Sequence, residues 1–144
     1  MRQHCANAAQ VAHFLQTHPL VQRVHYPGVA GHRQFLLATQ QMKGYGGMIS
    51  FEIEGGREAA NAFFRSLRVF SFAESLGGVE SLACYPAEMT HGAIPREERE
   101  RRGITEGLIR LSVGIEDSED LLADLSGALA AAESVTLHAE GVVL

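Results

Sequence analysis

Arg110 is the residue of this sequence best suited to bind an anion. It lies in a short strand-like run between Gly107 and Gly114, and the alternation of the run places it on one face with Leu108 and Ser112. A guanidinium among apolar neighbours is costly to bury unless an anion meets it. Its planar fork stays charged at any working pH and matches a carboxylate. The run therefore predicts an arginine that binds a carboxylate.

A plainer interpretation of the same arginine is an internal ion pair on an edge strand. The acids that could serve are Glu52, Glu74 and Glu116. The strand alone leaves both interpretations open, so the residues that precede it are needed to distinguish a ligand-binding arginine from an internal ion pair.

Upstream of this strand, polar residues gather around a pair of glycines. Glu74 and Ser75 stand just before Gly77-Gly78, and glycines allow tight turns and the close approach of a ligand. Thr90 and His91 follow a proline turn. Each residue also has a plain role: Ser75 in the turn, Glu74 as a surface carboxylate, and Thr90 with His91 as a local hydrogen-bonded pair.

The other reactive side chains predict no metal site and no nucleophilic catalysis. The histidines lack the paired Cys/His spacing of structural zinc sites, so no metal site is predicted. Cys5 and Cys84 are expected to be buried thiols in a reducing compartment, with Cys84 in an apolar strand. Lys43 is the only lysine, and it lies in a glycine-rich loop.

The composition indicates one ordinary globular domain. The chain has 144 residues, of which 46% are hydrophobic and 20% charged, enough to bury a core. A formal charge of −5 argues against a nucleic-acid partner, since no basic surplus neutralises phosphates. No signal peptide or membrane-spanning run is evident, so a cytoplasmic location and no membrane partner are expected.

Periodicity predicts an α+β domain. The expected helices cover 1–17, 32–41, 57–67, 95–102 and 118–133, and the expected strands cover 20–25, 46–54, 69–72, 81–85 and 108–113. The regular strand-helix-strand order of a parallel sheet is missing, so an antiparallel sheet with helices packed on one face is predicted. The helix at 95–102 should be a solvated face with Glu97–Arg101 and Glu98–Arg102 ion pairs.

Several blocks of the sequence, in order, resemble one known family. They are Val24–Gly28, Gly44–Met48, Glu74–Leu82, Met89–His91 and Leu108–Asp117. Together they resemble the C-terminal small domain of the Cys/Met-metabolism enzymes, over residues from about 2 to 132. These are fold-type-I enzymes that depend on pyridoxal phosphate and include cystathionine gamma-synthase, gamma-lyase and beta-lyase.

The resemblance implies a role for each candidate residue. Arg110 would grip the α-carboxylate of an amino-acid substrate, with Ser75 beside that carboxylate. Glu74 would face the far end of the substrate, and a glutamate there resembles the gamma-synthase and gamma-lyase branch. Thr90 would lie near the wall of the active site. No catalytic or cofactor-binding residue is assigned, because Lys43 does not match the family's Schiff-base lysine motif.

The same resemblance implies that the chain is part of a transsulfuration enzyme. Residues 1–133 would form the substrate-clamp domain, with an interdomain helix at 1–17 and a tail at 134–144, and the large domain that binds pyridoxal phosphate would be absent. We therefore expect a fragment that is inactive alone, from a family of homo-oligomers. The alternatives are a stand-alone amino-acid-binding or interaction domain, or one subunit of a split enzyme.

Overall fold

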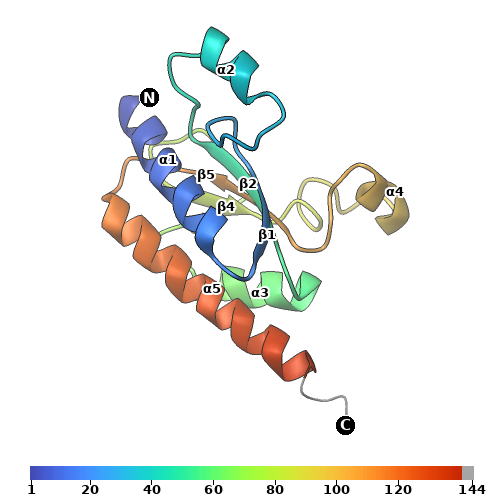
Figure 1. Ribbon diagram of the computed structural model, residues 1–144. Helices are drawn as coiled ribbons and strands as arrows, with labels where there is room; N and C mark the ends of the chain where they lie inside the picture. Colours follow the sequence, from blue (N-terminus) through green and yellow to red (C-terminus); the bar gives the residue numbers. More distant parts are fainter. Residues whose placement is uncertain (141–144) are drawn as a thin grey trace.

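The computed structural model describes residues 1–140 of the chain, as a five-stranded sheet with helices (Figure 1). The helices are α1 (Arg2–Thr17), α2 (Phe35–Gln41), α3 (Gly56–Ser66), α4 (Arg96–Arg101) and α5 (Ser118–Glu140). The strands are β1 (Val21–His25), β2 (Met48–Ile53), β3 (Ser71–Phe72), β4 (Leu82–Cys84) and β5 (Leu108–Ser112). Each expected element is present, so the predicted α+β class is confirmed.

The sheet has the order β1-β2-β5-β4-β3 and is antiparallel except at one edge. The pairs β1–β2, β2–β5 and β4–β5 are antiparallel, whereas β3 and β4 are parallel, with Ser71 opposite Leu82 and Phe72 opposite Ala83. Parallel neighbours cannot be joined by a tight hairpin. The connection between β3 and β4 must therefore cross back over the sheet, and this connection lies at the candidate site.

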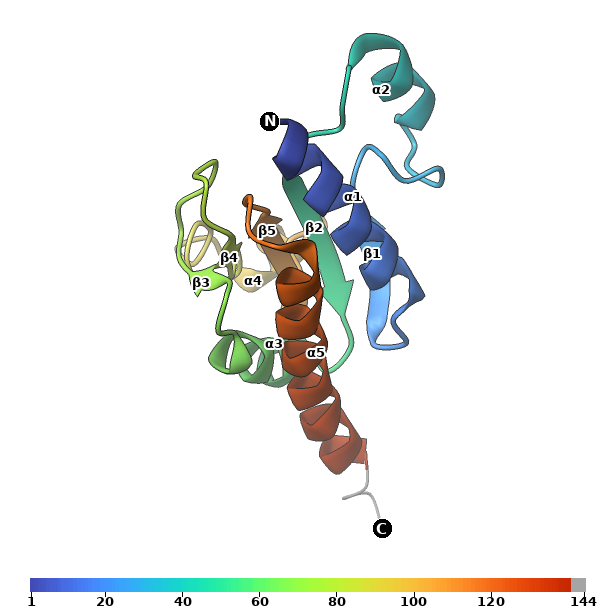
Figure 2. The same cartoon turned by 90° about the vertical axis from the view of Figure 1, so that its left-hand side faces the viewer.

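One face of the sheet forms the core of the molecule. Along β2 and β5 every second residue is fully buried, which is the pattern of strands with one covered face. The inward residues are Ile49, Phe51, Ile53, Ile109 and Leu111. Helices α1, α3 and α5 lie on this face, with α5 alongside both of the others, while α2 and α4 project from the layer (Figures 1 and 2).

Helix α5 extends further than the sequence pattern predicted. It continues to Glu140 instead of ending at Glu133, so residues 134–140 of the expected tail are helical, and residues 141–144 lie outside the described part of the chain. Ser134 and Thr136 donate their hydroxyl protons to carbonyls one turn back, at 2.9 and 3.1 Å, which satisfies these polar groups within the helix. Within residues 1–140, no helix combines the length and the apolar character needed to cross a membrane.

Candidate carboxylate-binding site

Arg110 lies on the face of the sheet opposite the helical layer. On β5 its neighbours Ile109 and Leu111 are fully buried in the core, whereas Arg110 is only partly buried. Its cross-strand partners are Ser50 on β2 and Cys84 on β4. The predicted alternation of this strand is therefore confirmed, and the guanidinium is kept out of the apolar core.

The connection between β3 and β4, residues 73–81, crosses this open face and is called the clamp loop below. The Gly77 amide donates to the hydroxyl of Ser112 on β5 at 2.8 Å, and Ser112 is almost fully buried. Gly77 has φ +82°, a left-handed conformation that favours glycine. The loop is thus attached to the same strand, and to the same face of it, as Arg110.

The clamp loop holds the Arg110 side chain through its backbone. The Nη2 of Arg110 donates to the carbonyl oxygen of Glu74 at 2.7 Å and makes a longer contact with that of Ser75 at 3.4 Å. Both acceptors are neutral, so they orient the guanidinium without cancelling its charge. Among residues 1–140, Arg110 forms no ion pair and its other N–H groups have no hydrogen-bond partner.

Two of the three acids that could have neutralised this arginine, Glu52 and Glu116, are engaged elsewhere, and no ion pair joins the third, Glu74, to it among residues 1–140. Glu52 accepts a hydrogen bond from His25 at 2.9 Å and lies 3.9 Å from Arg23. Glu116 accepts hydrogen bonds from Ser81. The plainer interpretation, an internal ion pair, is therefore not what the described residues show.

The side chains of Glu74 and Ser75 remain exposed. No hydrogen bond among the described residues engages the Ser75 hydroxyl or the Glu74 carboxylate. Thr90 lies in the connection between β4 and α4, where its hydroxyl is 2.6 Å from Nδ1 of His91. The structure thus brings Glu74, Ser75 and Arg110 together, whereas no hydrogen bond in the described chain connects Thr90 to them.

Cys84 on β4 lies directly opposite Arg110 on β5. Burial raises the pKa of its thiol, while the positive charge of Arg110 acts in the opposite direction. With 1% of its surface exposed, Cys84 is buried as predicted, although it shares the sheet face of Arg110 and is not part of the apolar cluster beneath the helices. Cys5 differs from the expectation, because it is only partly buried.

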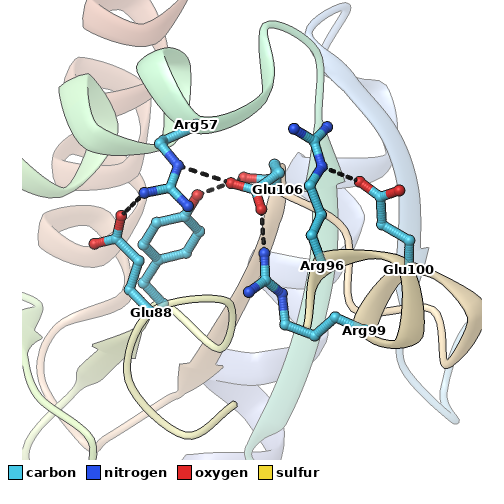
Figure 3. Close-up of polar contacts among 7 residues, drawn as sticks. Arg57, Glu88, Arg96, Arg99, Glu100 and Glu106 are labelled. Carbon is cyan, nitrogen blue, oxygen red and sulfur yellow. Dashed lines mark hydrogen bonds and ion pairs between the residues drawn. The ribbon is translucent and has the colours of Figure 1, made fainter. Parts of the chain in front are cut away.

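A second charged cluster, which joins α3, α4 and the segments before α4 and β5, was not predicted (Figure 3). Glu106 is 9% exposed and accepts hydrogen bonds from Arg57 at 2.8 Å and from the buried Arg99. Arg57 also reaches Glu88 at 2.6 Å, and the Tyr85 hydroxyl donates to the Glu106 carbonyl at 2.8 Å. Burial, followed by the nearby charge of Glu106, raises the pKa of Tyr85 to about 12.

This cluster corrects the prediction of a wholly solvated α4. Arg99 is 5% exposed and contacts Glu106, and its Nε has no partner within the described residues. The expected Glu98–Arg102 pair is present at 2.8 Å, but Arg101 pairs with Glu98 rather than with Glu97. Since α4 is charged at every position, its sequence carries no signal that distinguishes the one buried arginine.

Lys43 does not provide a cofactor site beside the clamp. It lines a largely apolar hollow of about 760 Å³ together with Met1, Arg2 and Cys5, at the segment that follows α2. Arg110 and the clamp loop do not line this hollow. The residues around Arg110 include no amine that could bind pyridoxal phosphate covalently.

Comparisons with known proteins agree on one family. Residues 1–130 match the family model described as "Cys/Met metabolism PLP-dependent enzyme". The chain is 54% identical over 131 residues to an L-methionine gamma-lyase of Pseudomonas putida, covering 91% of this chain and 33% of that protein. It is 56% identical over 123 residues to a cystathionine gamma-lyase of Bacillus subtilis, covering 85% of this chain and 32% of that protein. The chain thus spans about a third of the length of these relatives.

Solved structures give the same result for the fold. A cystathionine gamma-synthase from Xanthomonas oryzae pv. oryzae, in complex with aminoacrylate and cysteine, matches 94% of this chain with a TM-score of 0.89 and 51% identity, and 35% of that chain is covered. A cystathionine gamma-lyase from Lactobacillus plantarum, complexed with L-serine, matches 92% of this chain with a TM-score of 0.86 and 49% identity, again over 35% of its own length. The matched part is the C-terminal portion of the synthase, as the sequence blocks predicted.

Proposed function

This chain belongs to the Cys/Met metabolism PLP-dependent enzyme family, and we propose that within such an enzyme it binds the α-carboxylate of the amino-acid substrate. The observation that carries this proposal is the state of Arg110. Its guanidinium is oriented by two backbone carbonyls and is paired with no acid among residues 1–140.

The geometry of the clamp suits a carboxylate ligand. One nitrogen of Arg110 is used to hold the side chain in place, and the remaining N–H groups of the fork are left to donate. A carboxylate that accepts from them forms charge-assisted bonds, which are about twice as strong as neutral ones. Holding the carboxylate also fixes the orientation of the substrate's α-carbon, and such positioning lowers the barrier of the step that follows.

The neighbouring residues extend this proposal to the rest of the substrate. The exposed Ser75 hydroxyl would donate to the same carboxylate, and the exposed Glu74 carboxylate would face the far end of the substrate side chain. Thr90 would contribute to the wall of the pocket from the β4–α4 connection. A whole enzyme with this clamp would exchange or eliminate a group at the gamma carbon, as in the gamma-synthase and gamma-lyase branch.

The chemistry at the substrate would depend on residues other than those described. Pyridoxal phosphate, when bound in such an enzyme, supplies the electron sink for the reaction. Because the only lysine, Lys43, lies away from the clamp, we expect this chain alone to be inactive. Mixing it with pyridoxal phosphate should give no stoichiometric absorbance band from covalently bound cofactor; a band that survives Lys43→Ala would contradict this expectation.

The carboxylate clamp can be tested by heteronuclear NMR on the chain itself. Titration with L-serine at neutral pH should shift the side-chain N–H of Arg110 and the amides of Ser75 and Leu76 in a saturable manner. We expect millimolar affinity, because one arginine clamp gains little beyond the cost of association. L-Serinamide, which has no carboxylate, should leave these signals in place.

Matched variants make this test specific for Arg110. Arg110→Gln should abolish the shifts, because the charge and the fork are both lost. Arg96→Gln, at an exposed arginine that pairs with Glu100, should bind L-serine like the parent chain. The proposal fails if no saturable shift occurs, if serinamide gives the same shifts, or if Arg110→Gln retains them.

A further inference from the structure

The clamp loop rests on the short turn that links β5 to α5. The Ile115 amide donates to the Val79 carbonyl at 2.9 Å, and the Gly114 amide donates to the Ser81 hydroxyl at 2.8 Å. The Glu116 carboxylate accepts from both the amide and the hydroxyl of Ser81, at 2.6 and 2.8 Å. The C-terminal half of the loop therefore has its hydrogen bonds with this turn.

The turn itself is held by side chains of α1. Nδ2 of Asn7 donates to the carbonyl oxygens of Glu116 and Gly114, at 2.8 and 3.2 Å. Gln3 donates to Oδ1 of Asn7 at 2.8 Å and so fixes which way the amide faces. Nδ1 of His4 lies 2.8 Å from the Val113 carbonyl. Figure 1 shows the orange β5–α5 connection passing beside the first turns of α1.

The turn and the clamp loop approach each other closely at Gly114. A Cβ atom on Gly114 would lie 2.3 Å from the Val79 carbonyl oxygen and 2.4 Å from a carboxylate oxygen of Glu116. Ser81 is fully buried between them. Because the contact involves backbone atoms on both sides, a displacement of the turn must be transmitted to the clamp loop.

Asn7 is an unexpected residue for its position. It shares the buried face of α1 with apolar residues, and none of its surface is exposed. An apolar side chain would fill such a place without the cost of desolvating an amide. The hydrogen bonds of Asn7 to other elements of the fold all go to the turn, so its polar group fixes the turn relative to α1.

We propose that Asn7 and Glu116 are positioning residues that connect α1 to the carboxylate clamp. The position of α1 fixes the position of the turn, and the turn fixes the position of the clamp loop. The carbonyl oxygens of the loop then orient the guanidinium of Arg110. This inference rests on the proposed function for its meaning, since it concerns the same arginine. It adds that the clamp is assembled only when α1 is docked, so the part of an enzyme that carries α1 controls the substrate grip.

Amide hydrogen exchange on the ligand-free chain tests this connection. In Asn7→Ala, the amides of Ser81 and Ile115 should exchange about tenfold faster relative to the core amide of Phe51, as expected for the loss of a hydrogen bond to a buried group. The Arg110 side-chain signal should move toward the position of an exposed arginine. Val11→Ala, on the same buried face of α1, should accelerate all three amides together.

A milder variant protects the test against a failure to fold. Glu116→Gln keeps one acceptor oxygen but loses the charge-assisted bonds to Ser81, at a partly exposed position. It should accelerate exchange at Ser81 selectively, by several-fold. The inference is overturned if Asn7→Ala and Val11→Ala give the same pattern, or if Glu116→Gln leaves Ser81 unchanged.

These experiments use no amino-acid ligand, so their outcome is independent of the L-serine titration. The selective change in exchange can be present or absent whether or not the clamp binds a carboxylate. Conversely, a chain that binds L-serine but shows no selective effect of Asn7→Ala would retain the proposed function and lose the connection to α1.

Discussion

Arg110 and Arg99 are both arginines without full access to solvent, yet the chain treats them in opposite ways. Arg99 is almost fully buried against the carboxylate of Glu106. Arg110 is half-buried, and its guanidinium donates hydrogen bonds only to backbone carbonyl oxygens. One guanidinium is neutralised by the fold and the other is not, and the second is the one that we propose binds a ligand.

The comparison also shows how neutral acceptors differ from acids around an arginine. A carboxylate partner fixes the side chain and removes its charge, which closes the site to a second anion. Carbonyl oxygens fix the side chain and leave the charge in place, so an incoming acid meets an oriented guanidinium. The following predictions test this distinction, from the largest expected effect to the smallest.

Glu106→Ala should produce the largest loss of stability. It leaves Arg99 buried without an acid, and breaking a buried pair in this way costs about 3–5 kcal/mol. Urea denaturation followed by circular dichroism measures the change. Glu97→Ala, an exposed acid in α4, is the matched control and should change the free energy of unfolding by less than about 0.5 kcal/mol. Similar losses in the two variants would contradict a structural role for the cluster.

Acid should weaken the Glu106 cluster. Burial alone would raise the pKa of Glu106, but the hydrogen bond from Arg57 and the charges of Arg57, Arg99 and Arg96 outweigh it, so the pKa is lowered. A carboxyl group with a lowered folded-state pKa stabilises the protein above its unfolded pKa, near 4.3 for glutamate. That contribution is lost as the pH falls through the folded pKa.

This acid effect can be assigned with one variant. The free energy of unfolding of the parent chain should decline steeply below about pH 4, whereas Glu106→Gln should decline less steeply because its side chain does not titrate. Urea melts at a series of acidic pH values give both slopes. Equal slopes would mean that Glu106 is not the group responsible.

Arg110→Gln should have a small effect on stability despite abolishing ligand binding. The substitution removes hydrogen bonds to carbonyl groups at a partly exposed site, a loss of about 1 kcal/mol or less. Comparison of its urea midpoint with that of Glu106→Ala makes the contrast quantitative. If Arg110→Gln destabilises the chain as much as Glu106→Ala does, the arginine is a structural residue and the comparison collapses.

Glu88→Gln should have the smallest effect. Its pair with Arg57 is at the solvent-exposed side of the cluster, where both side chains are largely accessible and ion pairs contribute little. Its thermal unfolding midpoint should coincide with that of the parent within the error of the measurement. A clear shift would show that the cluster extends to the surface as one cooperative unit.

Much of the clamp could be predicted because its strand has a regular pattern. Alternation along 108–112 placed Arg110 on the face away from the core, and the glycines at 77–78 indicated a tight turn nearby. The contacts that hold the arginine could not be predicted, because they come from the backbone of Glu74 and Ser75, and any sequence has carbonyl groups. Thr90 was grouped with them by resemblance alone; its hydroxyl lies beside Nδ1 of His91, and its place in the pocket wall stays a prediction.

The Glu106 cluster escaped prediction for a different physical reason. Its members come from α3, the β4–α4 connection, α4 and the approach to β5, and Arg57 and Glu106 are 49 residues apart. Helix propensity and ion-pair spacing describe only neighbours within one helix. The continuation of α5 past Glu133 was missed for a related reason, since serine and threonine weaken a helix in isolation but bond back to its carbonyls here.

The parallel pairing of β3 with β4 has a consequence for how such a domain can change over evolutionary time. Because the crossing connection grips the guanidinium with its main chain, its outward side chains carry no share of that task. Under the proposed function, mutations at Glu74 or Leu76 would therefore alter which substrates are preferred, while the proposed recognition of the α-carboxylate would be inherited intact.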